Sequence, residues 1–558
     1  MQGTKKNTNN FLVQGSILAA ASIFVRLIGL LYRIPMTRII GNAGNGLYGY
    51  AFEIYNIALI LSSYTLPIAV SKLVAARNSQ KQYRNAYRIF LSAMCFAVVV
   101  GLVASLIIYF GADFFAMIVN DPLVAIPLKV LSPTIFVFAV MGVLRGFYQG
   151  KNTMIPTSVS QIVEQVVNAV VSIVAAYLLV KNFSASENVA AYGAAGGTFG
   201  TLIGALVGLL FLLFVFKIYK PLLNKQLRKD TSSYRESYSV TFKLLIITIL
   251  PIILSQTVYQ ISGVLDGTLF GHIMASKKMS SFDQAVFKNP ITSIYTQEVR
   301  RELMGIYSGK YRLLTNVPIA IASAIGAAII PSIISARIKG MEAAIKDKVH
   351  AAIKFNMLIA IPSAVGMSVL ASPILKLLFN DTDVLTANLL RIGSICIIFF
   401  ALSTVTNAIL QGINLLRIPV IHSAISLGIH VVLLFVLLQF TNLSTYALVI
   451  GNVTFALVVC ILNWISVAKH LKYKQEIKKT FLIPTICAAL MGVATYYTHY
   501  GLNALTGHNA LATLVSLVVA VIVYFILLIL MKGIEEQELE FIPKGKKIVR
   551  VLKKIHLL

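Results

Sequence analysis

Charged residues are scarce in this sequence, and acidic ones are especially few. Only 12% of the 558 residues are charged and 58% are hydrophobic, whereas ordinary soluble domains have roughly 25% charged and about 45–50% apolar residues. The mean hydropathy is +0.82. A soluble protein of this length would have to expose large apolar patches to water. The composition therefore excludes an ordinary soluble protein and predicts an integral membrane protein.

Paired cysteines and catalytic motifs are also absent from the sequence. The four cysteines lie in separate apolar stretches, at no metal-ligand or redox spacing: Cys95, Cys396, Cys460 and Cys487. There is no GxxxxGK(S/T) phosphate-binding loop, no HExxH and no GxSxG. We therefore expect no enzymatic activity, no metal site and no direct use of ATP.

The basic residues, 48 against 20 acidic ones, are spaced in a way that indicates membrane topology. Apolar stretches of about 20 residues, long enough to cross a bilayer, recur about fourteen times. Every second connection is basic: residues 72–88 carry five Lys or Arg and no acid, whereas residues 111–123 carry two Asp and no base. Cytoplasmic loops have this basic excess, so we expect both termini in the cytoplasm. A nucleic-acid-binding protein would instead gather its basic residues on one soluble face, and no nucleic-acid partner is expected.

Short motifs recur in the same order in the two halves of the chain. The matched segments, first half with second, are 46–48 with 305–307, 120–121 with 380–381, and 149–152 with 411–414. With six spans in each copy, both copies start on the same side of the membrane, as parallel repeats do.

The sequence therefore predicts an all-α polytopic membrane protein made of two six-helix lobes and two further C-terminal helices. The expected divisions are an N-terminal lobe at 1–216, a basic cytoplasmic linker at 217–243, a C-terminal lobe at 244–470, and the last two helices with a cytoplasmic tail at 471–558. Two facing lobes enclose a cleft, and rocking them gives alternating access. This architecture favours a transporter.

Arginines in the first span are the main candidates for a binding site. An arginine at the centre of a membrane helix costs about 2.5–3.5 kcal/mol on insertion scales. Arg26 and Arg33 are seven residues apart and share one helical face, Arg38 follows, and Glu53 is the only acid nearby in sequence. Either this face lines a hydrated cavity that an anionic ligand would occupy, or Arg33 and Arg38 extend to the outer membrane surface.

A polar stripe in the fifth span is the second candidate feature. Its members are spaced for one helical face: Gln161, Glu164, Gln165 and Asn168. Glu164 has three candidate partners, Arg145 in the fourth span and Arg26 or Arg33 in the first. A structural pairing between helices and a contact with substrate are both open.

The second lobe is polar but carries less charge. Its candidate binding residues are Gln256 and Tyr259 in the seventh span and Asn407 and Gln411 in the tenth. Asp266, also in the seventh span, is the candidate group for coupling to Na⁺ or H⁺, because hard cations prefer oxygen ligands. The alternative for Asp266 is a counter-charge to an arginine or a water-exposed position.

The first span carries the most specific resemblance to a known family. The segment 22–29 (SIFVRLIG), followed by Arg33, Arg38 and Gly41, is similar to a Ser-Arg-x-x-Gly pattern with further basic residues and a glycine turn. It resembles the polysaccharide-biosynthesis branch of the multidrug/oligosaccharidyl-lipid/polysaccharide exporter superfamily. This branch includes the MurJ-type lipid II flippases and stage V sporulation protein B.

The resemblance implies a flippase for an undecaprenyl-diphosphate-linked peptidoglycan precursor, lipid II, in the bacterial cytoplasmic membrane. It implies that Arg26, and with it Arg33 and Arg38, contacts the diphosphate. Residues 57–61 are uncharged where those flippases usually have another arginine. Asp266 matches one position of the family's Na⁺ site, but the eleventh span has no acid. The coupling ion, Na⁺ or H⁺, and the choice between lipid II and a related lipid-linked sugar therefore stay open.

Partners and alternatives follow from the same resemblance. The expected partners are a lipid-linked anionic sugar, membrane lipids and cell-wall synthesis proteins, with the chain acting as a monomer. One alternative is a flippase for another lipid-linked oligosaccharide, of teichoic acid, capsule or spore cortex. A second is a cation or drug antiporter of the related MATE type, which Glu53 and Glu164 favour and the arginines oppose. A third is a membrane scaffold that transports nothing.

Overall fold

The computed structural model describes residues 2–230, 232, 234–279, 294–338 and 340–534. This part of the chain is helical, with one isolated β-bridge between Lys278 and Ile294. The chain divides into two compact units: unit 1 contains residues 1–279 and 290–309, and unit 2 contains 280–289 and 310–558. The units are defined by packing, whereas the lobes expected from the sequence follow the internal repeat, so the expected divisions stay a prediction.

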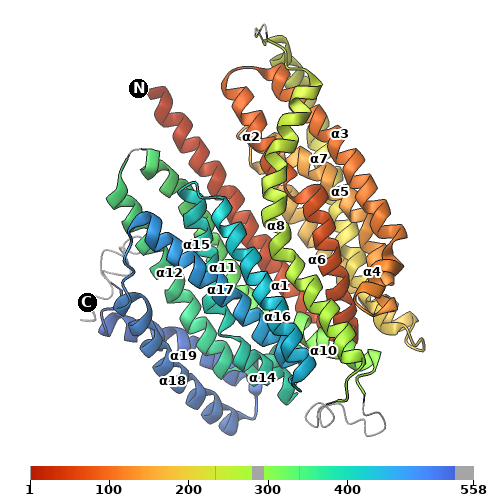
Figure 1. Cartoon of the computed structure of the whole chain (residues 1–558), viewed down its shortest axis with the longest axis vertical. Helices are drawn as coiled ribbons and strands as arrows, with labels where there is room; N and C mark the ends of the chain where they lie inside the picture. Colours follow the sequence, from red (N-terminus) through yellow and green to blue (C-terminus); the bar gives the residue numbers. More distant parts are fainter. Residues whose placement is uncertain (1, 231, 233, 280–293, 339, 535–558) are drawn as a thin grey trace. The chain divides into compact units, whose positions relative to one another are not determined.

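Unit 1 begins with a very long helix (Figure 1). Its elements are α1 (Gln2–Leu59), the π-helical turn η1 (Ile60–Tyr64), α2 (Leu66–Ser79), α3 (Tyr83–Phe110), α4 (Ala112–Ile118), the 3-10 turn η2 (Pro122–Val124), α5 (Ala125–Gly150), α6 (Ile155–Asn182), α7 (Val189–Arg228), α8 (Tyr238–Ala275) and α10 (Gln297–Ile306).

The described part of unit 2 begins at Lys310, within the π-helical segment η3 (Tyr307–Tyr311). Its further elements are α11 (Arg312–Ile338), α12 (Glu342–Val369), α13 (Ala371–Phe379), α14 (Val384–Gly393), α15 (Cys396–Gly412), α16 (Arg417–Phe440), α17 (Thr445–Leu471), the π-helical turn η4 (Lys478–Leu482), α18 (Ile483–Thr506) and α19 (Asn509–Leu530).

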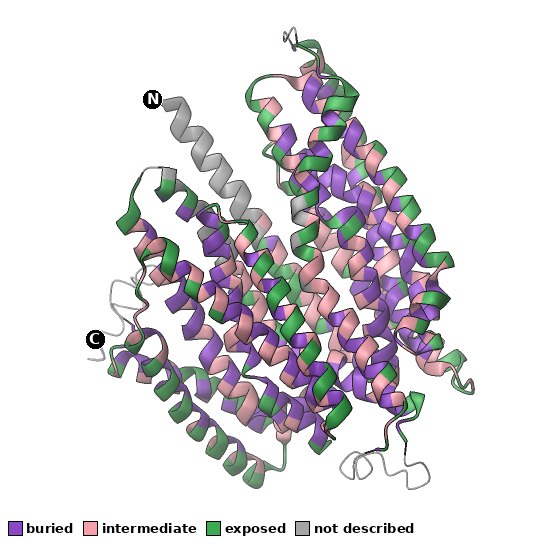
Figure 2. Ribbon diagram, in the orientation of Figure 1, coloured by how far each residue is buried: buried purple, intermediate pink, exposed green. Residues whose placement is uncertain are grey.

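Membrane-crossing length and apolar composition are confirmed for most of the chain. Among the described residues, 11 helical segments can cross a bilayer by these criteria, and the first, Ala20–Ser79, has 60 residues, enough for two crossings. Exposed positions run along outer helices such as α3 and α16 (Figure 2), and they include Val99, Ile107 and Val432. The all-α polytopic class is therefore confirmed, while the count of about fourteen spans and the cytoplasmic termini stay predictions.

A kink at Gly41 separates the two spans within α1. Gly41 has φ 67° and ψ −178°, a conformation that a residue with a Cβ rarely adopts. The Asn45 side-chain amide donates hydrogen bonds to the carbonyl oxygens of Gly41 at 2.7 Å and Thr37 at 3.1 Å. Asn45 thereby satisfies backbone acceptors at the kink, as a low-dielectric environment requires.

The repeated Asn-containing motifs have the same backbone structure in both halves. Asn120 and Asn380 have φ of 56° and 54°, and Asn152 and Asn414 have φ of 57° and 63°. Each follows the last turn of a helix, where asparagine is one of the few side chains that tolerate a left-handed conformation. The motifs matched by sequence therefore terminate equivalent helices.

Candidate functional site

The arginine-bearing half of α1 packs against the polar stripe of α6. The Asn168 amide lies 3.5 Å from the Tyr32 hydroxyl and accepts a hydrogen bond from Ser172 at 2.9 Å. A Cβ built on Gly29 would lie 3.2 Å from the Gln165 amide nitrogen, so the missing side chain leaves room for Gln165 beside α1. Asn168 is thus buried between helices, and its contacts are structural.

Arg33 is half-buried on this part of α1. Its guanidinium carbon lies 4.2 Å from the centre of the Tyr48 ring, a cation–π geometry that stabilises a charge away from bulk water. Its Nε is buried and has no hydrogen-bond partner within the described part of the chain. Because this Nε–H is not used within the described part of the chain, Arg33 can donate it to an acceptor from outside the protein. The side chains of Arg26 and Arg38 are exposed.

Arg145 on α5 is the ion-pair partner of Glu164. The guanidinium Nη2 lies 2.6 Å from Glu164 Oε2, and Nε donates to the Ser160 hydroxyl at 3.0 Å. Arg145 is only 8% exposed. The structure thus selects the α5–α6 pairing from the three partners that the sequence left open. Because Arg145 neutralises Glu164, this carboxylate does not compensate the charge of the α1 arginines.

Two acidic side chains of unit 1 lie at α8: Glu53 packs against this helix from α1, and Asp266 belongs to it. The Glu53 carboxylate is half-buried and packs so closely on Gly263 that a Cβ there would overlap it. Asp266, one turn further along α8, is 5% exposed and accepts a hydrogen bond from the Tyr307 hydroxyl at 3.4 Å. Among the described residues, no three His, Cys, Asp or Glu side chains gather as metal ligands.

The remaining predicted residues divide between the units. Gln161 Oε1 is buried without a hydrogen-bond partner among the described atoms, and Gln256 on α8 is exposed. In unit 2, Asn407 Oδ1 accepts a hydrogen bond from Asn463 at 2.7 Å, and Gln411 is exposed at the end of α15. The Tyr259 side chain lies outside the described residues. Substrate binding by these residues stays a prediction.

Sequence reasoning missed two buried ion pairs at the repeated Asn-Asp motif. In unit 1, Arg301 on α10 donates to Asp121 through two nitrogens, at 2.5 and 2.6 Å. In unit 2, the Lys310 ammonium lies 2.5 Å from Asp381. Each aspartate also accepts a backbone N–H two residues along the chain. The signal was present in the sequence, because the same Asn-Asp pair occurs at matched positions of both halves.

The family model described as Polysaccharide biosynthesis protein matches residues 12–337, more than half of the chain. The chain belongs to this family. A second model, Lipid II flippase MurJ, matches residues 311–516.

Relatives within the family agree with this assignment. Lipid II flippase MurJ of Bacillus subtilis (strain 168) is 26% identical, over 87% of this chain and 87% of the relative. Stage V sporulation protein B of the same organism is 25% identical, over 97% and 99%. The resemblance stated from the first span is thereby confirmed, and the chain is a multi-pass bacterial membrane protein.

Solved structures share the fold. A lipid II flippase MurJ in an inward closed conformation matches with a TM-score of 0.63 and 15% identity, covering 91% of this chain and 97% of that one. An inward-facing MATE family multidrug resistance transporter matches with a TM-score of 0.62 and 16% identity, covering 80% and 95%. At these identities the likeness shows the fold alone, and it agrees with the transporter architecture of the family.

Proposed function

We propose that this chain is a flippase that moves lipid II, the undecaprenyl-diphosphate-linked peptidoglycan precursor, across the cytoplasmic membrane by alternating access. Transport is driven by the membrane potential or an ion gradient, and no covalent bond of the substrate changes. The similarity to Lipid II flippase MurJ of Bacillus subtilis supports this substrate class. Membrane lipids and cell-wall synthesis proteins are the further partners, and the working unit is a monomer.

The observation that carries the proposal is the unpartnered donor of Arg33 on the arginine-bearing face of α1. The buried Nε of Arg33 has no hydrogen-bond partner within the described part of the chain, and the nearby carboxylate of Glu164 is already paired with Arg145. A diphosphate offers acceptor oxygens in the geometry that a guanidinium fork binds best. A site for cationic drugs would instead need a carboxylate that is not neutralised by a neighbour.

The test is complementation of cells depleted of their own lipid II flippase. Wild type, Arg26→Ala, Arg33→Ala and Lys181→Ala are compared at matched membrane levels. Lys181 is exposed at the end of α6, so its removal changes the charge without touching the arginine face. We expect rescue by wild type and Lys181→Ala, and loss of rescue by both arginine variants. Equal rescue by all four chains would refute the role of the arginines.

A related substrate is the second candidate. The match to stage V sporulation protein B covers 97% of this chain, more than the 87% covered by the MurJ relative. If wild type reaches the membrane but does not rescue flippase-depleted cells, the same variants should be tested in sporulating cells that lack this relative. Rescue there would assign a lipid-linked precursor of the spore cortex. Failure in both settings would favour teichoic acid or capsule precursors, or the antiporter activity of the MATE type.

A further inference from the structure

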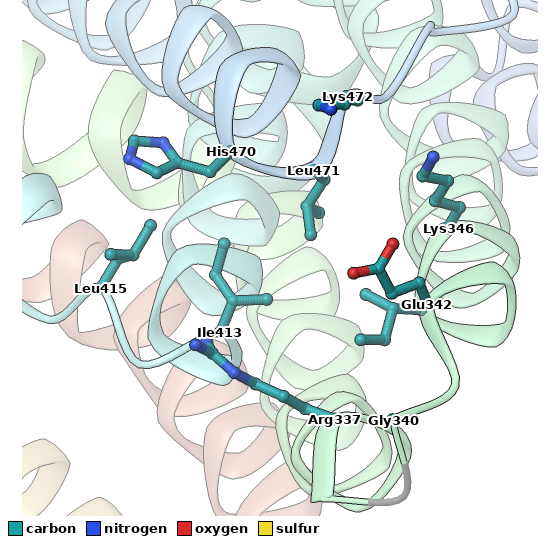
Figure 3. A pocket seen from close by; sticks show the side chains of 10 residues that line it. Arg337, Gly340, Glu342, Lys346, Ile413, Leu415, His470, Leu471 and Lys472 are labelled. Carbon is teal, nitrogen blue, oxygen red and sulfur yellow. The ribbon is translucent and has the colours of Figure 1, made fainter.

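Unit 2 contains a cavity of about 410 Å³ at one end of its helices. It is formed by the end of α11, the start of α12, the turn after α15 and the end of α17 (Figure 3). Ile413 and Leu471 form an apolar middle, and charged side chains surround them. The charge pattern of the loops predicts that these helix ends lie on the cytoplasmic side of the membrane.

The charges around this cavity are mostly positive. Arg337, Lys346 and Lys472 line it together with one acid, Glu342, which leaves a formal charge of +2 when His470 is neutral. None of the ion pairs formed by the described residues includes any of these three cations. Like charges that surround one cavity repel each other, so an anion in the cavity would stabilise the arrangement.

The equivalent cavity in unit 1 is lined by different side chains. It measures about 370 Å³ and is formed by the repeat-related turn at Gly150–Thr153 and by the end of α7. Lys151 is one of the residues that line it, and its ammonium donates to Tyr219 Oη at 2.9 Å and Gln226 Oε1 at 2.6 Å. Burial lowers the pKa of this ammonium to about 8. In unit 1 the lysine that lines the cavity is thus already bound by the protein's own acceptors.

The motif alignment shows what replaces this lysine in unit 2. Gln149-Gly150-Lys151-Asn152 corresponds to Gln411-Gly412-Ile413-Asn414, so Ile413 stands where unit 1 has Lys151. The cations that line the cavity of unit 2 come instead from the ends of three other helices. The fold therefore keeps the cavity in both repeats, but the cation of unit 1 is bound by internal acceptors, whereas the three of unit 2 take part in none of the ion pairs of the described residues.

We propose that the cavity of unit 2 binds a phosphoryl anion, the charged group of an anionic lipid headgroup or of a free phosphate compound. Its volume is within the usual range for small-molecule sites. Arg337 supplies a guanidinium fork, and Lys346 and Lys472 supply ammonium donors. Basic cavities at the cytoplasmic membrane surface suit such headgroups. Glu342 repels the ligand and limits its affinity. This site is separate from the arginine face of α1 and does not depend on the proposed flippase activity.

The experiment measures anion binding by the purified full-length chain. One arm titrates inorganic pyrophosphate against the chain in phosphatidylcholine nanodiscs, following the thermal unfolding midpoint. The other arm adds a minor fraction of phosphatidylglycerol to the nanodiscs and counts retained lipid by native mass spectrometry. Dependence on Arg337 and Lys472 in the first arm identifies a soluble phosphate compound as the ligand, and dependence in the second identifies a lipid headgroup.

Four single variants with the unliganded stability of wild type decide the outcome. Arg337→Gln and Lys472→Gln should each weaken binding about fivefold, the effect of one basic residue near a membrane surface. Lys469→Gln removes the same charge from the same end of α17 but from outside the cavity, and should change binding less than twofold. Glu342→Gln should tighten binding. Equal losses in Lys469→Gln and Lys472→Gln, or no dependence on Arg337 and Lys472 in either arm, would overturn the proposal.

Discussion

Single residues in unit 1 show how the protein holds charge within an apolar molecule. Arg33 lies over the Tyr48 ring, and Arg145 binds a carboxylate and a hydroxyl. Lys151 donates hydrogen bonds to Tyr219 and Gln226. The three environments differ in how many hydrogen-bond donors they leave unpartnered. Arg145 and Lys151 are occupied by the protein's own acceptors, whereas Arg33 retains an unpartnered donor. The identity of the arginine that can meet an anion therefore depends on packing, not on the number of arginines.

The Arg145–Glu164 pair should behave as a buried pair. We expect Arg145→Gln alone to lower the free energy of unfolding by up to about 3–5 kcal/mol, because it leaves the Glu164 carboxylate, only 17% exposed, without its cation. The double variant Arg145→Gln/Glu164→Gln should lose much less. Thermal unfolding of wild type, Arg145→Gln, Glu164→Gln and the double variant in detergent gives the coupling energy. The pair Lys129–Asp113, with side chains 40% and 66% exposed, is the control, and breaking it should cost about 0–1 kcal/mol. Similar losses from both pairs would contradict the buried-pair interpretation.

Lys151 should make stability rise with pH. Burial lowers its pKa from an ordinary value of 10.5 to about 8, so between these two values the unfolded state binds more protons than the folded state. Stability then increases as pH rises from about 8 toward 10.5. The measurement is the unfolding midpoint of wild type and Lys151→Met over this pH window. A difference between the two chains that stays constant with pH would show that the lysine does not titrate there.

Helix crossings depend on glycines that place two backbones in contact. Gly46 on α1 and Gly305 on α10 face each other across the crossing, and a Cβ on either would overlap a backbone carbonyl of the other helix. Small residues at this spacing let membrane helices approach closely. Gly49 extends the contact, because a Cβ there would approach the Ser308 side chain. The kink at Gly41 precedes the crossing and is stabilised by Asn45, so the first two spans of the chain meet α10 at a fixed place.

Gly305→Ala should therefore destabilise the chain. The added methyl group forces α1 and α10 apart, and overpacking of this kind costs about 1–3 kcal/mol. Gly428→Ala on α16 is the matched control, since a Cβ there would meet nothing within 4 Å and alanine favours helix by roughly 1 kcal/mol. Thermal unfolding in detergent should show a loss for the first variant and no loss for the second. Equal midpoints would mean that the crossing adapts without strain.

At the scale of the whole molecule, the sequence predicted the class of architecture better than the pairing of its charges. Hydropathy and loop charge are local properties, so the helical membrane fold could be predicted from them. The repeated asparagine motifs also have matching left-handed backbone conformations in the two halves. The Asp121–Arg301 pair joins residues 180 positions apart, and helical spacing gives no information about contacts at that distance. For the same reason, the sequence could name three partners for Glu164 but could not choose Arg145.

Ion coupling is the property that the whole molecule must supply if the chain transports a lipid against a gradient. Asp266 is buried on α8 and accepts a hydrogen bond from Tyr307, so a cation or proton bound there would change the charge within unit 1 where α8 meets the start of the second repeat. We expect Asp266→Asn to remove the dependence of flipping on an Na⁺ or H⁺ gradient, while Tyr307→Phe weakens it, because the aspartate loses one hydrogen-bond donor. The assay uses proteoliposomes with a fluorescent lipid-linked precursor, with each gradient imposed in turn. If Asp266→Asn flips at the wild-type rate and responds to both gradients as wild type does, the driving force acts elsewhere, and the membrane potential acting on the diphosphate becomes the remaining source.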